Sequence, residues 1–81
     1  MTPSDLKRKL ETKQAKEWGY KSIKESNDDG YNVTRVNCTV SEMSDVLKIS
    51  DTEARRMKDE WKYNGLIKFV AVCGLDQIIF I

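Results

Sequence analysis

Two stretches with helical spacing of apolar residues follow each other closely between residues 40 and 64. The first begins with TVSE (39–42), the sequence of a capping box, in which the Thr39 hydroxyl accepts from the Glu42 amide and the Glu42 carboxylate reaches back. Apolar residues then recur at helical spacing at Met43, Val46 and Leu47. This pattern predicts a helix over residues 40–48.

The second stretch has a similar start, eleven residues further on. SDTE (50–53) is again the sequence of a capping box, and Ile49 before it is an isolated apolar residue between the two helices. Ala54, Met57 and Trp61 form one apolar stripe, and Gly65 suits the left-handed position after a helix. The stretch therefore predicts a second helix over residues 51–64, close behind the first.

The chain then changes to a pattern typical of strands. LIKFVAV (66–72) and QIIFI (77–81) are rich in β-branched and aromatic residues, and CGLD (73–76) between them has the character of a tight turn. This part predicts a β-hairpin over residues 66–81.

The N-terminal part is less regular. Residues 4–26 predict one helix, which Ser4 can cap and whose apolar side Trp18 and Ile23 continue, although Gly19 is able to bend or break it. NDDG (27–30) predicts a turn, and the β-leaning residues after it predict a short strand over 33–38.

Length and composition indicate a single domain with almost no net charge. With 81 residues, 40 % of them apolar and 33 % charged, the chain is expected to form a single globular domain over 1–81. Fourteen basic and thirteen acidic residues leave a formal net charge of only +1. Any contact with nucleic acid must therefore come from the local placement of charge, because the whole protein has no strong positive field.

Several kinds of chemistry are not expected. The chain has no histidine, which removes the commonest general base and metal ligand, and its two cysteines alone do not predict a zinc site. We expect no catalytic residues, no cofactor and no metal. Cys38 and Cys73 are expected to be free thiols in a reducing cytoplasm, with a redox bridge as the alternative. No apolar run reaches the length of a membrane span, so no membrane association is expected.

Residues 38–81 closely resemble the winged helix-turn-helix family. The resemblance lies in TVSEMSDVLKISDTEARRMKDEWKYNGLIK: two capped helices with Ser44 where they cross, the Ile49 plug, and the exit at Gly65 into a wing. It implies an α+β fold with three helices and a small antiparallel β-sheet, and a recognition helix at 51–64. One departure is Lys58, at a position that commonly holds a large aliphatic residue, so that Met57 and Trp61 must fill the space.

The outward face of residues 51–64 supplies the candidate DNA-binding residues. With the apolar stripe turned inward, steps of about 100° per residue place a mixed set of side chains outward. We expect the DNA-binding residues to be Thr52, Arg55, Arg56, Asp59 and Lys62. Asp59 could orient Arg55 or Arg56 or accept from cytosine, whereas Tyr63 is expected to pack beside the wing. The alternative is that the two arginines belong to a solvated face with surface ion pairs.

The resemblance implies a small regulator, of a prokaryote, phage or plasmid, that binds double-stranded DNA and controls transcription by occupying a promoter. It also implies a homodimer that reads two half-sites. The lysines and arginines of residues 4–26 are either a solvated helix face or a phosphate-binding or dimer surface. A protein-interaction module without DNA binding, such as a phage-encoded inhibitor or assembly factor, is the alternative function, because the turn CGLD has no Arg or Lys.

Overall fold

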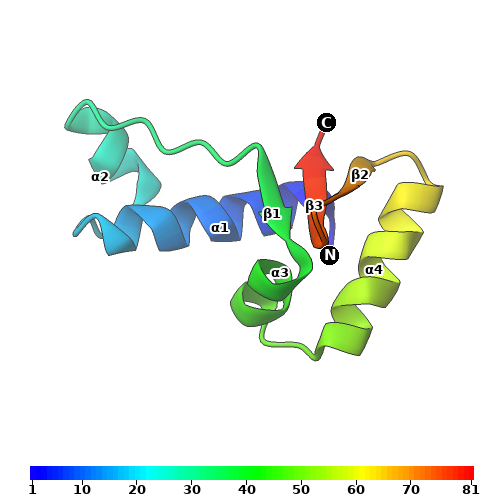
Figure 1. Cartoon of the computed structure of the whole chain (residues 1–81). Helices are drawn as coiled ribbons and strands as arrows, with labels where there is room; N and C mark the ends of the chain where they lie inside the picture. The colour runs from blue at the N-terminus through cyan, green and yellow to red at the C-terminus, as the bar shows by residue number, and fades with distance from the viewer.

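The computed structural model describes the backbone of residues 1–81 and all side chains except those of Val72 and Leu75. Its elements follow the order helix, helix, strand, helix, helix and hairpin (Figure 1). They are α1 (Pro3–Glu17), α2 (Ile23–Asp28), β1 (Asn37–Thr39), α3 (Val40–Leu47), α4 (Asp51–Tyr63), β2 (Ile67–Val72) and β3 (Leu75–Phe80). The protein thus has an α+β fold with three main helices and a small three-stranded antiparallel sheet.

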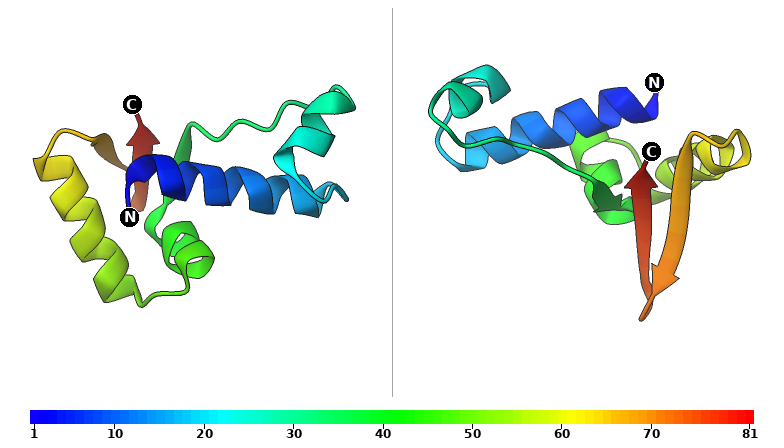
Figure 2. Two further views of the ribbon diagram at one scale, coloured as in Figure 1. Left: turned by 180° about the vertical axis from the view of Figure 1, so that it is seen from behind. Right: turned by 90° about the horizontal axis from the view of Figure 1, so that it is seen from above.

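The sheet has β3 in its centre, with strand order β1-β3-β2. β2 and β3 pair along their whole length, from Ile67 opposite Phe80 to Val72 opposite Leu75. The two residues of the turn, Cys73 and Gly74, both have positive φ, as the favoured type I′ hairpin turn requires. The tip of this hairpin projects beyond the helices (Figure 2).

The predicted strand over 33–38 is wrong in its position, because β1 covers only Asn37–Thr39. Its partners on β3 are Gln77 to Ile79, and the amide of Phe80 donates one further bond to the carbonyl oxygen of Val36 at 3.0 Å. β3 ends at Phe80, so residues before Val36 have no strand opposite them. Val36 is accordingly 61 % exposed rather than part of the core.

The prediction of one helix over 4–26 is wrong, because residues 18–22 break it and residues 23–26 belong to a separate helix, α2. α1 starts at Pro3 with Thr2, not Ser4, as its cap, and it ends at Glu17. Gly19 follows in the left-handed region with φ of 92°, which stops the helix, and α2 then starts a new direction after its own cap. Trp18 is consequently 49 % exposed instead of continuing the apolar side.

α3 forms as its capping sequence predicts. The Thr39 hydroxyl accepts from the Glu42 amide at 3.0 Å, and the Thr39 amide donates to the Glu42 carboxylate at 3.2 Å. The helix ends one residue earlier than expected, because Lys48 adopts the left-handed conformation with φ of 56°. Residues 48–50 then carry the chain directly into α4.

α3 lies between α1 and α4 and contacts both of them (Figure 1). The buried core is built from one face of each of these helices and the inner face of the sheet. Its members are Leu6, Leu10, Cys38, Val40, Met43, Ala54, Trp61, Ile67 and Ile78. Ser44 is also buried, as expected for a small residue where α3 and α4 cross.

The inner face of α4 differs from the expected stripe at one position. Lys58 is only 8 % exposed and joins Ala54 and Trp61 on the buried side, whereas Met57 is partly buried. The Lys58 ammonium lies 4.1 Å from the centre of the Phe69 ring on β2, and such contacts between a cation and an aromatic face are favourable. The long Lys58 stem thus fills the space expected to be left to Met57 and Trp61.

Within the described part of the chain, no helix has both the length and the apolar character needed to cross a membrane.

Candidate nucleic-acid interface

The outer face of α4 presents the five predicted site residues to solvent. Thr52, Arg55, Arg56, Asp59 and Lys62 are all exposed along this helix. The structure thus places them on the predicted face, and the α3–α4 turn and the hairpin border it at either end (Figure 1).

The start of α4 is capped more simply than its sequence predicts. The Ser50 hydroxyl accepts from the Glu53 amide at 3.2 Å, but among the described side chains no bond returns from the Glu53 carboxylate to Ser50. Asp51 and Glu53 stand in the first turn, where the partial positive charge of the helix N-terminus favours acids. These two carboxylates therefore stabilise the start of the helix and leave the rest of its outer face uncovered.

Arg55 is held by the hairpin. Its guanidinium lies 3.3 Å from the Asp76 carboxylate on β3, a residue 21 positions further along the chain. The Arg55 side chain is 58 % exposed, so this pair is solvated and worth little in stability. Its effect is geometric, since it directs the guanidinium of Arg55 toward the hairpin.

Asp59 pairs with a lysine and not with either arginine, so its predicted pairing with Arg55 or Arg56 is wrong. The Lys58 ammonium lies 2.7 Å from the Asp59 carboxylate. This hydrogen bond and charge, with Lys62 and Arg55 nearby, lower the pKa of Asp59 below its ordinary value. Asp59 therefore stays ionised at neutral pH, with its charge largely balanced by Lys58.

The end of α4 carries one more cation near the hairpin. The Lys62 ammonium lies 5.6 Å from the centre of the Phe69 ring, at the outer range of a cation–π contact. Tyr63 beside it is 92 % exposed, so its expected packing against the hairpin is wrong. Among the described residues of this face, Arg56 has no ion-pair partner.

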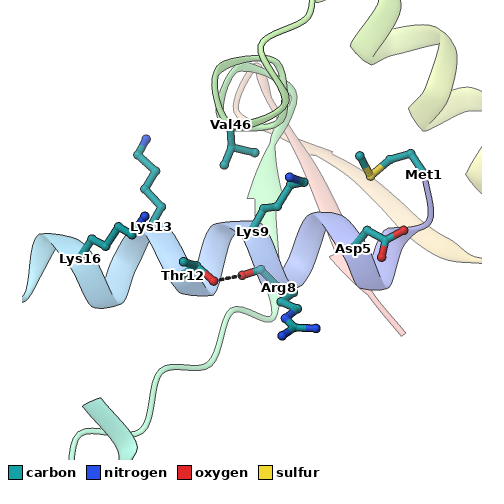
Figure 3. Close-up of a pocket in the computed structure, with 8 residues that line it drawn as sticks. All are labelled: Met1, Asp5, Arg8, Lys9, Thr12, Lys13, Lys16 and Val46. Carbon is teal, nitrogen blue, oxygen red and sulfur yellow. Dashed lines mark hydrogen bonds between the residues drawn. The ribbon is translucent and has the colours of Figure 1, made fainter. Parts of the chain in front are cut away.

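A second basic surface lies between α1 and α3 (Figure 3). It is an open groove of about 550 Å³, lined by Met1, Asp5, Arg8, Lys9, Thr12, Lys13, Lys16 and Val46. In Figure 3, Lys9 and Lys13 extend toward α3 on either side of Val46, whereas Arg8 points away from α3. We call this feature the α1 groove.

The cations of the α1 groove are unpaired. Of the ion pairs among the described side chains, none involves Arg8, Lys9, Lys13 or Lys16. Like charges at helical spacing, as at Lys9, Lys13 and Lys16, repel one another by a few tenths of a kcal/mol per pair, about 0.2–0.5. A bound anion would remove this repulsion, so the α1 groove is suited to phosphates.

The sequence leaves two roles open for the lysines that line the α1 groove, a solvated helix face or a phosphate-binding or dimer surface. The spacing of Lys9, Lys13 and Lys16 puts them on one side of a helix, but the sequence did not show whether acids from elsewhere would face them. Two acids whose charges interact with these lysines, Asp5 and Glu42, are engaged in their own contacts. Asp5 accepts from the Thr2 amide at 3.0 Å, and Glu42 pairs with Arg35 at 2.6 Å.

The two cysteines do not come together. Cys38 on β1 stands opposite Ile78 on β3, whereas Cys73 lies in the hairpin turn before β3 begins. The strand from Leu75 to Ile78 alone spans roughly 10 Å, beyond the reach of a disulfide. The alternative of a redox bridge between them is therefore wrong for this fold. Among the described residues, no group of three potential ligands could hold a metal ion.

Comparison with known proteins found no family model, no curated protein and no solved structure that matches this chain.

Proposed function

We propose that this chain is a winged helix protein that binds double-stranded DNA, with α4 as the recognition helix and the β2–β3 hairpin as the wing. The observation that carries the proposal is the pair α3 and α4, joined by residues 48–50, with α4 exposing a polar face beside a projecting hairpin. An exposed helix of this kind fits the major groove of B-DNA, which is about 12 Å wide.

The residues of α4 would have different roles in this complex. Arg56 is the side chain best suited to a guanine edge, because it is exposed and has no acidic partner to leave. Arg55 would meet the backbone near the hairpin, where Asp76 holds it. Thr52 and Lys62, near the two ends of the exposed face, would contact phosphates, and Asp59 would disfavour phosphate and accept from cytosine.

The α1 groove supplies positive charge that α4 lacks. Its cations lie on the other side of α3 from α4, and a duplex carries phosphates along both edges of its major groove. We assign to the groove contacts with the phosphate backbone, which add affinity without sequence preference. Regulation of transcription by promoter occupancy, by a homodimer on two half-sites, is the process that this interface would serve.

The test is binding of the purified chain to a mixture of random duplexes over a range of salt concentrations, followed by fluorescence anisotropy. The proposal predicts binding that weakens steeply with salt, and enrichment of a preferred sequence on repeated selection. A variant with Arg56→Ala should lose the sequence preference and keep most of the salt dependence. Failure to bind any duplex at low salt would overturn the proposal.

A protein-interaction module is the second candidate, and the pairing of α4 cations favours it. Arg55 and Lys58 are both engaged with acids of the chain itself, which leaves Arg56 and Lys62 as the cations of α4 outside the ion pairs among the described side chains. In that case a partner would be retained in a pull-down whether or not Arg55 and Arg56 are replaced by Ala, and duplex DNA would not compete.

A further inference from the structure

The C-terminal end of α1 and the whole of α2 lie at the end of the molecule opposite α4 (Figures 1 and 2). Three aromatic rings, those of Trp18, Tyr20 and Tyr31, gather in the segments next to these two helices. The ring centres of Trp18 and Tyr31 are 6.5 Å apart, and those of Tyr20 and Tyr31 are 6.1 Å apart. The rings are not parallel, with interplanar angles of 64° and 38°. Together they line an open hollow of about 510 Å³, which we call the aromatic cup.

The aromatic cup is not part of the hydrophobic core. Trp18 is 49 % exposed and Tyr31 is 59 % exposed, and neither belongs to the core cluster. Leaving such large rings in water forgoes the stabilisation that burial would provide. Exposed apolar surface that is gathered in one place commonly marks a binding site.

The segment that carries the cup is held in a defined shape. The Ser26 hydroxyl, which is fully buried, donates to the carbonyl oxygen of Tyr31 at 2.6 Å, and the Tyr31 amide donates to the carbonyl oxygen of Ser26 at 3.0 Å. The Tyr20 hydroxyl donates to the Asp29 carboxylate, across the same turn. The Tyr20 ring and the backbone of Tyr31 are thus positioned before any ligand arrives, which reduces the ordering cost of binding.

Acidic side chains lie next to the cup. Glu25, Asp28 and Asp29 line an adjoining hollow of about 360 Å³ together with Tyr20, which therefore borders both hollows. The hydrogen bond to Asp29 raises the pKa of Tyr20 to about 12, so the phenol stays protonated and polarised toward a carboxylate. Lys21 and Lys24 belong to the same segment, but neither lines either hollow.

The faces of the rings are free of the chain's own cations. Among the described side chains, the only aromatic ring that a lysine or arginine covers is Phe69, on β2. An aromatic face carries negative partial charge and attracts cations, most strongly where carboxylates add to the field. The cup therefore combines two features that favour a positively charged group and repel a phosphate.

We propose that the aromatic cup binds an arginine or lysine side chain of a partner protein, with the cation over the rings and the carboxylates beside it. This function goes beyond DNA binding, because it lies at the opposite end of the molecule from α4 and has the opposite charge preference. The partner would present a basic segment, and the chain could hold it while α4 occupies DNA.

A pair of short peptides tests the proposal directly. A blocked Gly-Arg-Gly peptide at millimolar concentration is titrated into the intact chain, and the same peptide with neutral citrulline in place of arginine is the control. The indole N–H signals of Trp18 and Trp61 are followed by NMR. We expect the arginine peptide to shift the Trp18 signal, to leave buried Trp61 unchanged, and to bind at least about threefold more tightly than the citrulline peptide.

Two variants and their control sharpen the result. Tyr31→Leu keeps apolar surface but removes one aromatic face, and Asp28→Asn removes one neighbouring charge, so each should weaken binding of the arginine peptide. Tyr63→Leu, which changes a 92 % exposed tyrosine at the other end of the molecule, should have no effect. Equal binding of both peptides, or no shift at Trp18, would overturn the proposal.

The same titration distinguishes other occupants. A single-stranded oligothymidylate is titrated in the same way. If it shifts the Trp18 signal more than the arginine peptide does, the ligand of the cup is a stacked nucleic acid and not a protein, and the proposal is overturned. Tetramethylammonium that binds more tightly than the arginine peptide would point to a small quaternary amine and would also overturn it. Loss of DNA binding in separate assays would leave this result untouched, so the two proposals fail independently.

Discussion

The cations of the α1 groove and two of the cations of α4, Arg55 and Lys58, occupy different electrostatic surroundings. On α4, Arg55 is paired with Asp76 and Lys58 with Asp59. In the α1 groove, by contrast, the ion pairs among the described side chains include none of the cations Arg8, Lys9, Lys13 and Lys16. A cation that already has a partner must give up that contact before it can bind a phosphate, and an unpaired one need not.

Under the proposed function, this difference separates two contributions to DNA binding, affinity and sequence preference. Unpaired cations release counterions when they meet DNA and so set affinity and its dependence on salt. In the proposed complex, Arg55 beside the hairpin would fix the register on the backbone, and Arg56 would set the preference for a sequence. The near-neutral total charge therefore does not exclude DNA binding, because the balancing acids lie mostly outside the α1 groove.

The largest expected effect comes from removing the free cations. The triple variant Lys9→Gln, Lys13→Gln and Lys16→Gln should weaken duplex binding at low salt by about a hundredfold and flatten the plot of log affinity against log salt by about 3 units. Anisotropy titrations at several salt concentrations measure both quantities. The matched control is Lys21→Gln with Lys24→Gln, two exposed lysines outside the groove, and their loss should cost far less per charge.

The next effect concerns the two arginines of α4. Arg56→Ala should cost roughly 1–3 kcal/mol on a selected sequence, because that side chain is available for a base edge. Arg55→Ala should cost less, since Arg55 is already held by Asp76. Asp76→Asn releases Arg55 and should strengthen binding a few-fold. Weaker binding of the Asp76 variant would show that the pair positions Arg55 for DNA instead of withholding it.

A smaller effect is expected for the buried lysine. Lys58→Met keeps the length of the stem against Phe69 without the charge, so the free energy of unfolding in urea should change by less than about 1.5 kcal/mol. Lys58→Ala should lose about 2 kcal/mol or more, because it empties the space beside that ring. Equal losses in both variants would assign the stabilisation to the charge and not to the stem.

The smallest effect is a dependence of stability on pH that links α3 to the α1 groove. Burial alone would raise the pKa of Glu42, but the hydrogen bond from Arg35, with the Thr39 amide and nearby charges including Lys13, lowers it. A carboxyl with a lowered pKa stabilises the fold above its ordinary pKa and loses that contribution as pH falls through the folded value. The free energy of unfolding should therefore fall between pH 6 and pH 3. In the Glu42→Gln variant this fall should be smaller by about 0.5 kcal/mol.

Local sequence signals predicted the helices and the hairpin well where neighbours in sequence decide the structure. The capping residues Thr39 and Glu42 act within one turn, and the outward face of α4 follows from helical geometry. Burial of Lys58 could not be predicted, because it depends on Phe69 of β2. For the same reason the pair of Arg55 with Asp76 was not foreseen, since only the folded chain brings them together.

In the N-terminal part, too, contacts between residues distant in sequence could not be predicted from local patterns. The apolar Trp18 suggested a helix that continues past Gly19, but the chain reverses there and places the ring beside Tyr31. No periodicity marks a cluster built from residues 18, 20 and 31, because its members meet through a turn. The sequence shows aromatic residues near a polar loop, but it does not show that their rings meet.

The two cysteines, Cys38 on β1 and Cys73 in the hairpin turn, are thiols of unlike reactivity. Burial raises the pKa of Cys38 to about 12, which keeps it a protonated and inert thiol, while Cys73 is exposed at the projecting tip. A maleimide dye or spin label added to the native chain should therefore attach at Cys73 alone, with no need to engineer the sequence. A reporter at this position would register whether the hairpin meets a duplex, a question that side-chain substitutions elsewhere answer only indirectly.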